Sequence, residues 1–327
     1  MPNSASTNAG MTQWDQYDYK PSLLAAVIAV AAFTTLGIIH IYQYLRYGSW
    51  FLYLLLAGVC MEIAGYWARV YSIKHSDNLG IHALDYYLTM LAPSVLAAAC
   101  YMVFGRLVYW VTPPSHRSFH QLWLPPRFLA PCFITLSVVS LTAQLVGILF
   151  LTDIMMSIDT SPQRHKDNTN IGIQILRAGL MFQMAIFGGF TALGIRFAYV
   201  RRRWVHVSPV AGVECWRIMA WMIRGVCTII SLRTLSRIFE FTLSDGRSYI
   251  THHEWTLYCF DALPMILVIA LFGVAHPGRY LPTDYTTLFH TVKKKTSGQK
   301  DKETDAWEVI RHQELVLASK SRCVAHF

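Results

Sequence analysis

The chain is poor in charged residues: Asp, Glu, Lys and Arg make up only 14% of its 327 residues, where a soluble domain carries roughly a quarter. It contains no Gly-x4-Gly-Lys-Ser/Thr string, which excludes a P-loop ATPase. It contains no Cys-x2-Cys pair, which argues against a zinc site. Because 54% of the residues are hydrophobic, composition places the chain in the membrane class.

Sorting signals are also missing. The first 20 residues are polar and carry no basic stretch before an apolar one, so we expect no cleavable signal peptide. No Asn-x-Ser/Thr sequon occurs, so glycosylation gives no indication of sidedness. The seven cysteines lie mostly inside apolar segments. We expect them to be buried structural thiols, with no disulfide, no bound metal and no cofactor.

What the chain does have is long apolar runs. Each is long enough to cross a bilayer core of about 30 Å as a helix, and only helices leave no unpaired backbone groups in lipid. The predicted fold is therefore an all-α integral membrane protein with seven transmembrane helices. The expected spans are Ser22–Leu45, Gly48–Ile73, Ala83–Val111, Phe128–Leu151, Gly172–Val200, Trp216–Phe241 and Trp255–Ala275.

The basic residues predict the orientation. They concentrate in the first, third and fifth loops, including Arg201–Arg203, and in the tail with Lys293–Lys295. The loop expected at Thr152–Ile171 offsets its bases with acids. Because cytosolic loops carry the excess of Lys and Arg, we expect the N-terminus outside and the C-terminus in the cytosol.

Three regions follow: an extracellular tail over 1–21, the membrane domain over 22–281 and a cytosolic polar tail over 282–327. The net charge of +9 could suggest nucleic acid, but it lies beside apolar spans, which is the pattern of membrane topology. No nucleic-acid partner is expected. The Lys293–Lys295 cluster either contacts anionic lipid or belongs to a solvated tail.

Ionisable and amide side chains inside the spans form stripes. An ionisable group at the bilayer centre costs about 2.5–3.5 kcal/mol on insertion scales, so each needs a partner or water. Spacings of i, i+4 and i+7 place three residues on one face of a helix, and the predicted topology puts three such faces in the outer half, with two glutamines at similar depth. The candidate residues are Glu62, Tyr66, Arg69, Gln144, Gln183, Arg233, Arg237, Glu240, Glu254, Tyr258 and Asp261.

Two interpretations of this layer remain open. It is an interhelical ion-pair network that fixes packing, or it lines an outward-facing polar cavity for the head group of an amphipathic ligand. Both can hold at once. In the second interpretation the acids attract an amine, while Arg69, Arg233 and Arg237 balance them or bind phosphate.

Two further sets of residues carry structural expectations. Pro93 and Pro264 lie inside predicted spans and are expected to kink them. Five tryptophans near predicted interfaces are expected to form an aromatic belt: Trp50, Trp110, Trp123, Trp204 and Trp255.

Several strings in this order resemble the fungal lipid-translocating exporter family, the RTA-like group named for aminocholesterol resistance. The resemblance covers about Leu24 to Leu281. The strings are Glu62-x2-Gly65-Tyr66-x2-Arg69, Ala92-Pro93-x4-Ala98-Ala99-x-Tyr101-x3-Gly105-Arg106, Gly179-Leu180-x2-Gln183, Arg233-x3-Arg237-x2-Glu240, Glu254-x3-Tyr258-x2-Asp261 and His276-Pro277-Gly278.

The resemblance implies a seven-span protein, mostly of the plasma membrane, linked to sphingoid long-chain bases, phospholipid asymmetry or resistance to toxic amphiphiles. One departure concerns the fourth span. The family usually places an acid two turns before the glutamine; here Gln144 is retained, but Ser137 stands at the acid's position. This departure removes the group that a proton-coupled step at that site would use.

The functional hypotheses are therefore two. The first is a transporter of amphipathic membrane lipids, sphingoid bases or phospholipids, that confers resistance to toxic amphiphiles without hydrolysing nucleotide itself. The alternative is a seven-span lipid sensor that regulates lipid asymmetry or other transporters. A zinc hydrolase is not expected, because His40 and His276 lie near one face and His252 and His253 near the other. We expect no enzyme activity, and the oligomeric state stays open.

Overall fold

The computed structural model describes residues 21–75, 79–112, 123–156, 162–201, 215–243 and 254–281. Seven helical segments in these ranges are long and apolar enough to cross a membrane, and the described residues are otherwise helical or in short turns. The predicted seven-helix, multi-pass architecture is therefore confirmed. The two tails expected at 1–21 and 282–327 lie, except for residue 21, outside the described residues.

Most helices extend beyond the apolar runs that predicted them, but the helix of the second span is shorter than its run. In chain order they are α1 (Leu23–Tyr47), the 3-10 turn η1 (Trp50–Leu52), α2 (Tyr53–Lys74), α3 (Leu79–Val111), α5 (Pro126–Met156), α6 (Pro162–Arg201), α7 (Cys215–Leu243), α8 (Glu254–Leu257), the π-helical turn η4 (Tyr258–Ala262), α9 (Leu263–Val274) and α10 (Pro277–Tyr280). The last span thus consists of four short segments.

The loop expected at Thr152–Ile171 is wrong for most of its length. α5 continues to Met156, and α6 begins at Pro162 and runs for 40 residues, or about 60 Å. Hydropathy marks where a helix leaves the apolar layer and does not mark where the helix ends, because polar residues in water continue a helix readily.

The ends of α1 follow from local chemistry. The Ser22 side chain accepts a hydrogen bond from the Ala25 amide at 3.4 Å and begins the helix, as N-cap residues do. Gly48 ends the helix in the left-handed region, with φ of 56°, where a residue without a Cβ is favoured. The chain can therefore reverse directly into η1 and α2.

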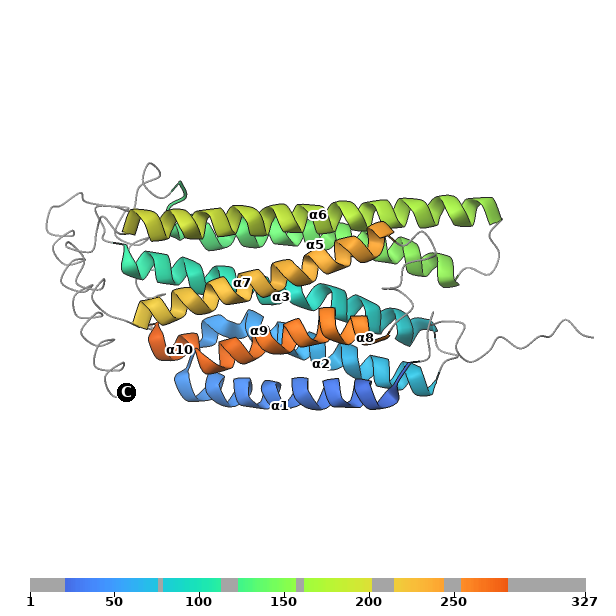
Figure 1. Ribbon diagram of the computed structural model, residues 1–327, viewed down its shortest axis with the longest axis horizontal. Coiled ribbons are helices and arrows are strands. Elements are labelled where there is room, and N and C mark those ends of the chain that lie inside the picture. The colour runs from blue at the N-terminus through green and yellow to red at the C-terminus, as the bar shows by residue number, and fades with distance from the viewer. Residues whose placement is uncertain are drawn as a thin grey trace, which may run out of the picture.

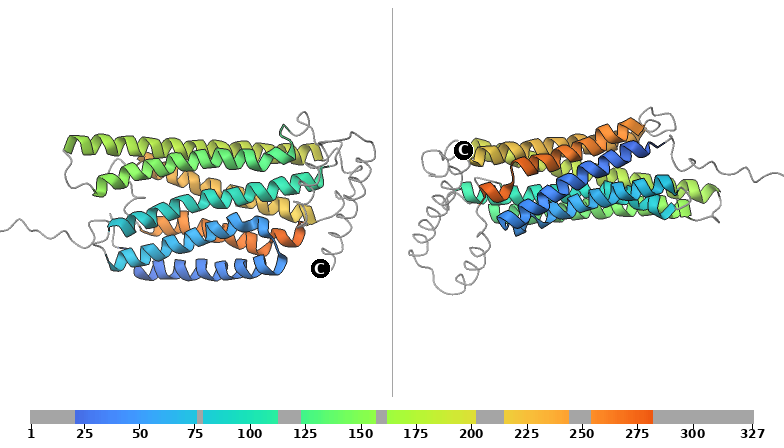
Figure 2. Two further views of the ribbon diagram at one scale, coloured as in Figure 1. Left: turned by 180° about the vertical axis from the view of Figure 1, so that it is seen from behind. Right: turned by 90° about the horizontal axis from the view of Figure 1, so that it is seen from below.

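The seven spans, α3 among them, close into a ring (Figures 1 and 2). Each span packs on the next, α9 returns to α1, and α3 contacts α7 as well as α2 and α5. The most apolar part of the α3 span is 78% buried, more than that of any other span. Residues on different faces of α3 therefore look into different parts of the interior.

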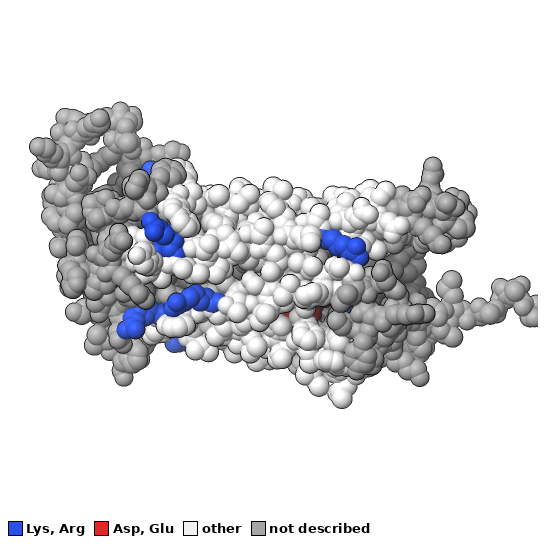
Figure 3. Space-filling view, turned by 45° about the horizontal axis from the view of Figure 1, so that its top comes forward, with Lys and Arg blue, Asp and Glu red and all other residues white. Residues whose placement is uncertain are grey.

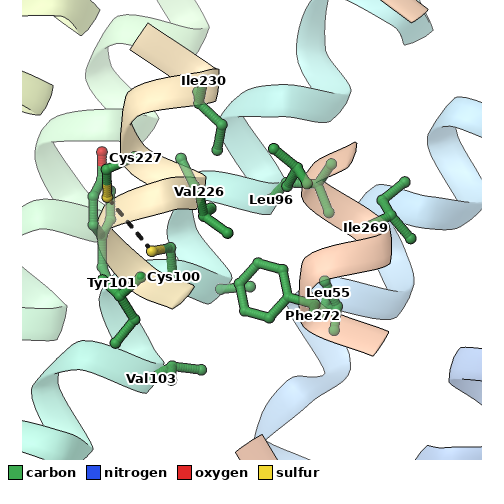
Figure 4. Packing of buried hydrophobic residues seen from close by; sticks show 14 of the residues in the cluster. Leu55, Leu96, Cys100, Tyr101, Val103, Val226, Cys227, Ile230, Ile269 and Phe272 are labelled. Carbon is green, nitrogen blue, oxygen red and sulfur yellow. Dashed lines mark hydrogen bonds between the residues drawn. The ribbon is translucent and has the colours of Figure 1, made fainter. Parts of the chain in front are cut away.

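A hydrophobic core runs through the bundle. Its largest fully buried side chains include Phe33, Phe51, Tyr101, Trp110 and Phe272, and Figure 4 shows the part where α3, α7 and α9 meet.

Two thiols lie within this core. The Sγ atoms of Cys100 on α3 and Cys227 on α7 are 3.7 Å apart, and both are free thiols.

The outer surface of the bundle is apolar. Figure 3 shows a face whose described surface is mostly uncharged along its length, with basic side chains gathered toward one end and one basic group near the other. Arg46, Arg127, Arg217 and Arg279 lie at the end where α1 finishes and α5 and α7 begin. We call it the basic end, and the opposite one the far end; the positive-inside rule predicts that the basic end is cytosolic.

The expected tryptophan belt is partly wrong. Trp50, Trp123 and Trp255 are exposed as a belt requires, but Trp110 is only 1% exposed and belongs to the core. Its position in the last turn of α3 predicted an interface, whereas α3 is enclosed by other helices. Trp204 lies outside the described residues.

A backbone carbonyl near the end of α9 ties α1 to the last span. Because α9 ends at Val274, the Gly273 carbonyl is one of the last four, which have no helical donor, and Gln43 Nε2 donates to it at 2.9 Å. One turn away on α1, His40 Nε2 donates to the Ile269 carbonyl at 2.9 Å. Two neighbouring polar side chains of α1 therefore hold the end of α9.

Close approach of α5 and α6 requires glycine at position 147. A Cβ on Gly147 would lie 2.8 Å from the Leu176 amide nitrogen and 3.0 Å from the Gly172 carbonyl oxygen, both rigid backbone atoms. We expect Gly147→Ala to lower the free energy of unfolding by about 1–3 kcal/mol, the usual cost of overpacking. The measurement is the melting temperature of the purified protein in detergent.

Gly188 on α6 is the matched control, because a Cβ there meets nothing within 4 Å. Gly188→Ala should be neutral or raise the stability by about 0.5–1 kcal/mol, the helical preference of Ala over Gly. A Gly147→Ala protein as stable as the wild type would contradict the close approach of α5 and α6.

Candidate functional site

A set of charged side chains lies inside the bundle toward the far end. They come from α2, α3, α7 and η4, which surround the interior there. We call this set the charged layer. Its members are Glu62, Arg69, Asp85, Arg233, Arg237, Glu240 and Asp261, and all except Glu240 are at most 5% exposed.

Asp261 is the centre of the layer. Its Oδ1 lies 2.5 Å from Arg233 Nη2 and its Oδ2 lies 2.8 Å from Arg237 Nη2. The two arginines are four residues apart on α7 and so lie on one face. A single carboxylate from the last span therefore binds two guanidinium groups of α7, which confirms that these two predicted stripes face each other.

A proline in α3 supplies Arg233 with a second acceptor. Pro93 lies inside α3 and lacks an N–H, which leaves the carbonyl of Thr89 without its helical donor. Arg233 Nη2 donates to this carbonyl at 2.7 Å. Besides the kink expected from it, Pro93 thus has a second role: it leaves the Thr89 carbonyl free to accept a hydrogen bond from the buried Arg233.

The π-helical turn η4 carries Asp261 into the interior. Within η4, Cys259 and Phe260 are exposed while Asp261 and Ala262 are buried. A π turn holds an extra residue compared with an α turn and is often found at functional sites. Pro264 follows in the first turn of α9, so the helical register changes immediately next to the site.

A second buried pair joins α2 to α3. Arg69 Nη1 and Asp85 Oδ2 are 3.3 Å apart, each with 5% of its side chain exposed. The Arg69 guanidinium carbon also lies 5.8 Å from the centre of the Tyr258 ring.

Asp85 is absent from the predicted site, because it stands near the start of its span. The sequence nevertheless contains a signal that pairs Asp85 with Arg69. Spans two and three are antiparallel neighbours, so residues similarly distant from their connecting turn, such as Arg69 and Asp85, lie at one depth.

Glu240 forms the edge of the layer. Its Oε2 lies 2.8 Å from Arg237 Nη1, and 29% of its side chain is exposed. Arg237 therefore bridges the fully buried Asp261 and a carboxylate that reaches the surface of the bundle. An edge pair of this kind contributes less to stability than a fully buried one.

Glu62 and Tyr66 are the exceptions to this pairing. Both are 1% exposed, and within the described part of the chain neither Glu62 Oε1 nor the Tyr66 hydroxyl has a hydrogen-bond partner. The charged groups acting on Glu62 include Asp261, Arg233 and Arg237, but none of them forms an ion pair with it. The Tyr66 ring stacks on Phe33 with centroids 5.0 Å apart. One face of α2 thus points two unsatisfied polar groups into the layer.

The remaining predicted residues lie elsewhere. Gln144 is buried between α5 and α6, where its Nε2 donates to Ser140 Oγ at 3.1 Å. Gln183 on α6 is also buried, and no described residue forms a hydrogen bond with either of its amide atoms. Glu254 begins α8, but its side chain falls outside the described part of the structure. The expected layer is thus formed mainly by α2, α3, α7 and η4.

Comparison with known proteins fits this arrangement. Residues 55–284 match the model of a family described as "RTA1 like protein", a stretch that contains every residue of the charged layer. The chain belongs to the RTA1-like family. No solved structure matches it.

Curated relatives of this family member are fungal. It is 30% identical to "Protoporphyrin uptake protein 1" of Saccharomyces cerevisiae over 66% of this chain and 65% of the relative. It is 30% identical to "Protein RTA1" of the same yeast over 67% of this chain and 63% of the relative. It is 24% identical to "Probable lipid transporter atnI" of Emericella nidulans over 80% of this chain and 67% of the relative. The matches therefore cover about two thirds of the relatives' own length.

Proposed function

We propose that this protein moves amphipathic lipids across the membrane, and that its substrate is a sphingoid long-chain base held by its protonated amine. The names of relatives such as "Probable lipid transporter atnI" support a role in lipid transport. We further propose that the protein acts in the plasma membrane, confers resistance to toxic amphiphiles and is not an enzyme.

The observation that carries this proposal is the charge balance of the layer. It contains four acids, Glu62, Asp85, Glu240 and Asp261, against three arginines. Each arginine is paired with Asp85, Asp261 or Glu240. Glu62 is the acid in excess, and its buried Oε1 has no hydrogen-bond partner among the residues that the structure describes. An ionised carboxylate in such a place is costly unless a cation compensates it, so a bound proton or a ligand's cation completes the layer.

A primary ammonium group fits this position better than a phosphate does. It offers three donors, while Glu62 Oε1 and the Tyr66 oxygen are acceptors without a donor. Three acids of the layer and one base, Arg69, act on Tyr66, so acids outnumber bases around its hydroxyl. A phosphate would require arginines that are already paired.

Specificity for the amine provides the test. Purified protein in proteoliposomes should transfer a labelled long-chain base between leaflets faster than empty vesicles do, and should transfer its N-acetylated analogue little. The analogue keeps the chain and the hydroxyl groups but cannot carry the charge. Equal transfer of both lipids would contradict an amine site. Transfer of neither, by folded protein, would instead favour the sensor hypothesis.

A further inference from the structure

A second group of polar side chains lies where α3, α5 and α6 meet. Tyr101 is 16 residues beyond Asp85, or about 160° around the axis of α3 at 3.6 residues per turn. It therefore faces away from the charged layer. Tyr101, Ser137 and Gln183 are all at most 3% exposed, and none of them belongs to the charged layer.

The packing of α5 on α6 places Ser137 opposite Gln183. On one side of this level, Ser140 Oγ donates to the Gly179 carbonyl at 2.8 Å. On the other side, the rings of Phe133 and Phe190 are 5.3 Å apart. Ser137 and Gln183 lie between these two contacts on their antiparallel helices, and both are buried, so their side chains enter the same level of the interface.

Tyr101 completes the group from α3. Its ring lies between α5 and α6, with centroid distances of 5.5 Å to Phe133, 6.3 Å to Phe187 and 4.7 Å to Phe190. Its hydroxyl faces Ser137 closely enough to interact with it. Aromatic rings thus form the wall toward the basic end, and the three polar side chains lie just beyond it.

The polar atoms of this group are not fully satisfied. Both amide atoms of Gln183 have no hydrogen-bond partner among the described residues. The Tyr101 hydroxyl and Ser137 Oγ have no partner there other than each other. Leaving such atoms unpaired in an apolar interior costs free energy, so a native structure normally satisfies them with a ligand or an ordered water. Together they offer four donor hydrogens and several acceptor lone pairs.

We propose that Tyr101, Ser137 and Gln183 form a second binding site, which takes an uncharged group able both to donate and to accept hydrogen bonds. Among the described residues, those acting on Tyr101 are Ser137 and the thiols Cys100 and Cys227, and no Asp, Glu, Lys or Arg is among them. A hydroxyl or amide of a membrane lipid has this chemistry, and so does water. The site is separate from the amine site at Glu62.

The test uses purified full-length protein and two neutral lipid probes. Ceramide carries one amide and two hydroxyl groups without charge, whereas a wax ester of matched chain length has no donor. Ceramide should raise the melting temperature of the wild type and of Glu62→Gln, and the wax ester should not. In Gln183→Met the affinity for ceramide should fall by at least about fivefold, the effect of one lost hydrogen bond.

A control variant and a second readout separate the outcomes. Thr142→Val removes an exposed hydroxyl from the same helix as Ser137 and should leave the ceramide effect unchanged. If ceramide has no effect, radiolytic hydroxyl labelling of Tyr101 tests for ordered water. Labelling of Tyr101 in the wild type that is lost in Gln183→Met identifies water as the occupant. If ceramide has no effect and Tyr101 is not labelled, the proposal of a second site is overturned. The long-chain base assay depends on Glu62 and not on the second site. A failure of the proposed amine site would therefore be recognised separately from a failure of the second site.

Discussion

Replacing Asp261 by Asn is expected to lower the free energy of unfolding by about 3–5 kcal/mol, the usual cost of removing one partner from a buried ion pair. Asp261 neutralises Arg233 and Arg237 at once, and both arginines are at most 4% exposed. An amide keeps the shape of the carboxylate but loses its charge. Arg233 would then lie in the interior without its acid, and Arg237 would keep only Glu240 at the edge of the layer.

Glu240→Gln is the matched comparison. It removes a carboxylate from the same Arg237, but at a position with 29% of its side chain exposed, so the expected loss is at most about 1 kcal/mol. The melting temperature and the yield of monodisperse protein in detergent measure both variants. Equal stability of Asp261→Asn and Glu240→Gln would contradict Asp261 as the centre of the layer.

An apolar replacement of the whole cluster separates charge from packing. Asp261→Leu combined with Arg233→Met and Arg237→Met leaves no buried charge without a partner among these three positions. Such substitutions are often neutral or stabilising, so the triple variant should be more stable than Asp261→Asn. If function needs only a packed bundle, the triple variant should also stay active. We expect the triple variant to be inactive.

The second large effect concerns Glu62. Glu62→Gln should leave the stability within about 1 kcal/mol of the wild type or raise it, because Glu62 Oε1 has no hydrogen-bond partner among the described residues to lose and the desolvation cost of the carboxylate disappears. Binding of the amine should be lost, because the remaining acids of the layer are already paired with arginines.

Binding is measured as the rise in melting temperature that a long-chain base produces. The wild type and Glu240→Gln should both respond, whereas Glu62→Gln should not. A response of Glu62→Gln equal to that of the wild type would show that another group receives the amine. The opposite pattern, a collapse of folded protein in Glu62→Gln, would show that Glu62 has a partner that holds the fold.

Much of the fold could be predicted from the sequence, because the bilayer makes span length and apolar content decisive. Spacing also identified the faces of α2 and α7 correctly, since residues at i, i+4 and i+7 must share a side of a helix. Trp110 shows the limit of this reasoning. Its distance from the end of a span predicted an interface, but whether that interface faces lipid depends on which helices surround α3.

The pairing within the site was harder to predict for three physical reasons. Asp85 lies close to the end of its span, where an acid needs no special explanation. Spacing placed Asp261 on an inward face, but the π turn that carries it there changes the helical register, which a period of 3.6 residues does not anticipate. The acceptor for Arg233 is a backbone carbonyl that Pro93 leaves free, so only the combination of proline position and helix packing reveals it.

The most direct test of the central claim is transfer of a labelled long-chain base in proteoliposomes that contain equal amounts of folded wild type or Glu62→Gln. We predict transfer by the wild type and none above empty vesicles by Glu62→Gln. Undiminished transfer by Glu62→Gln, from protein with unchanged melting temperature, would contradict an amine site at the unpaired acid.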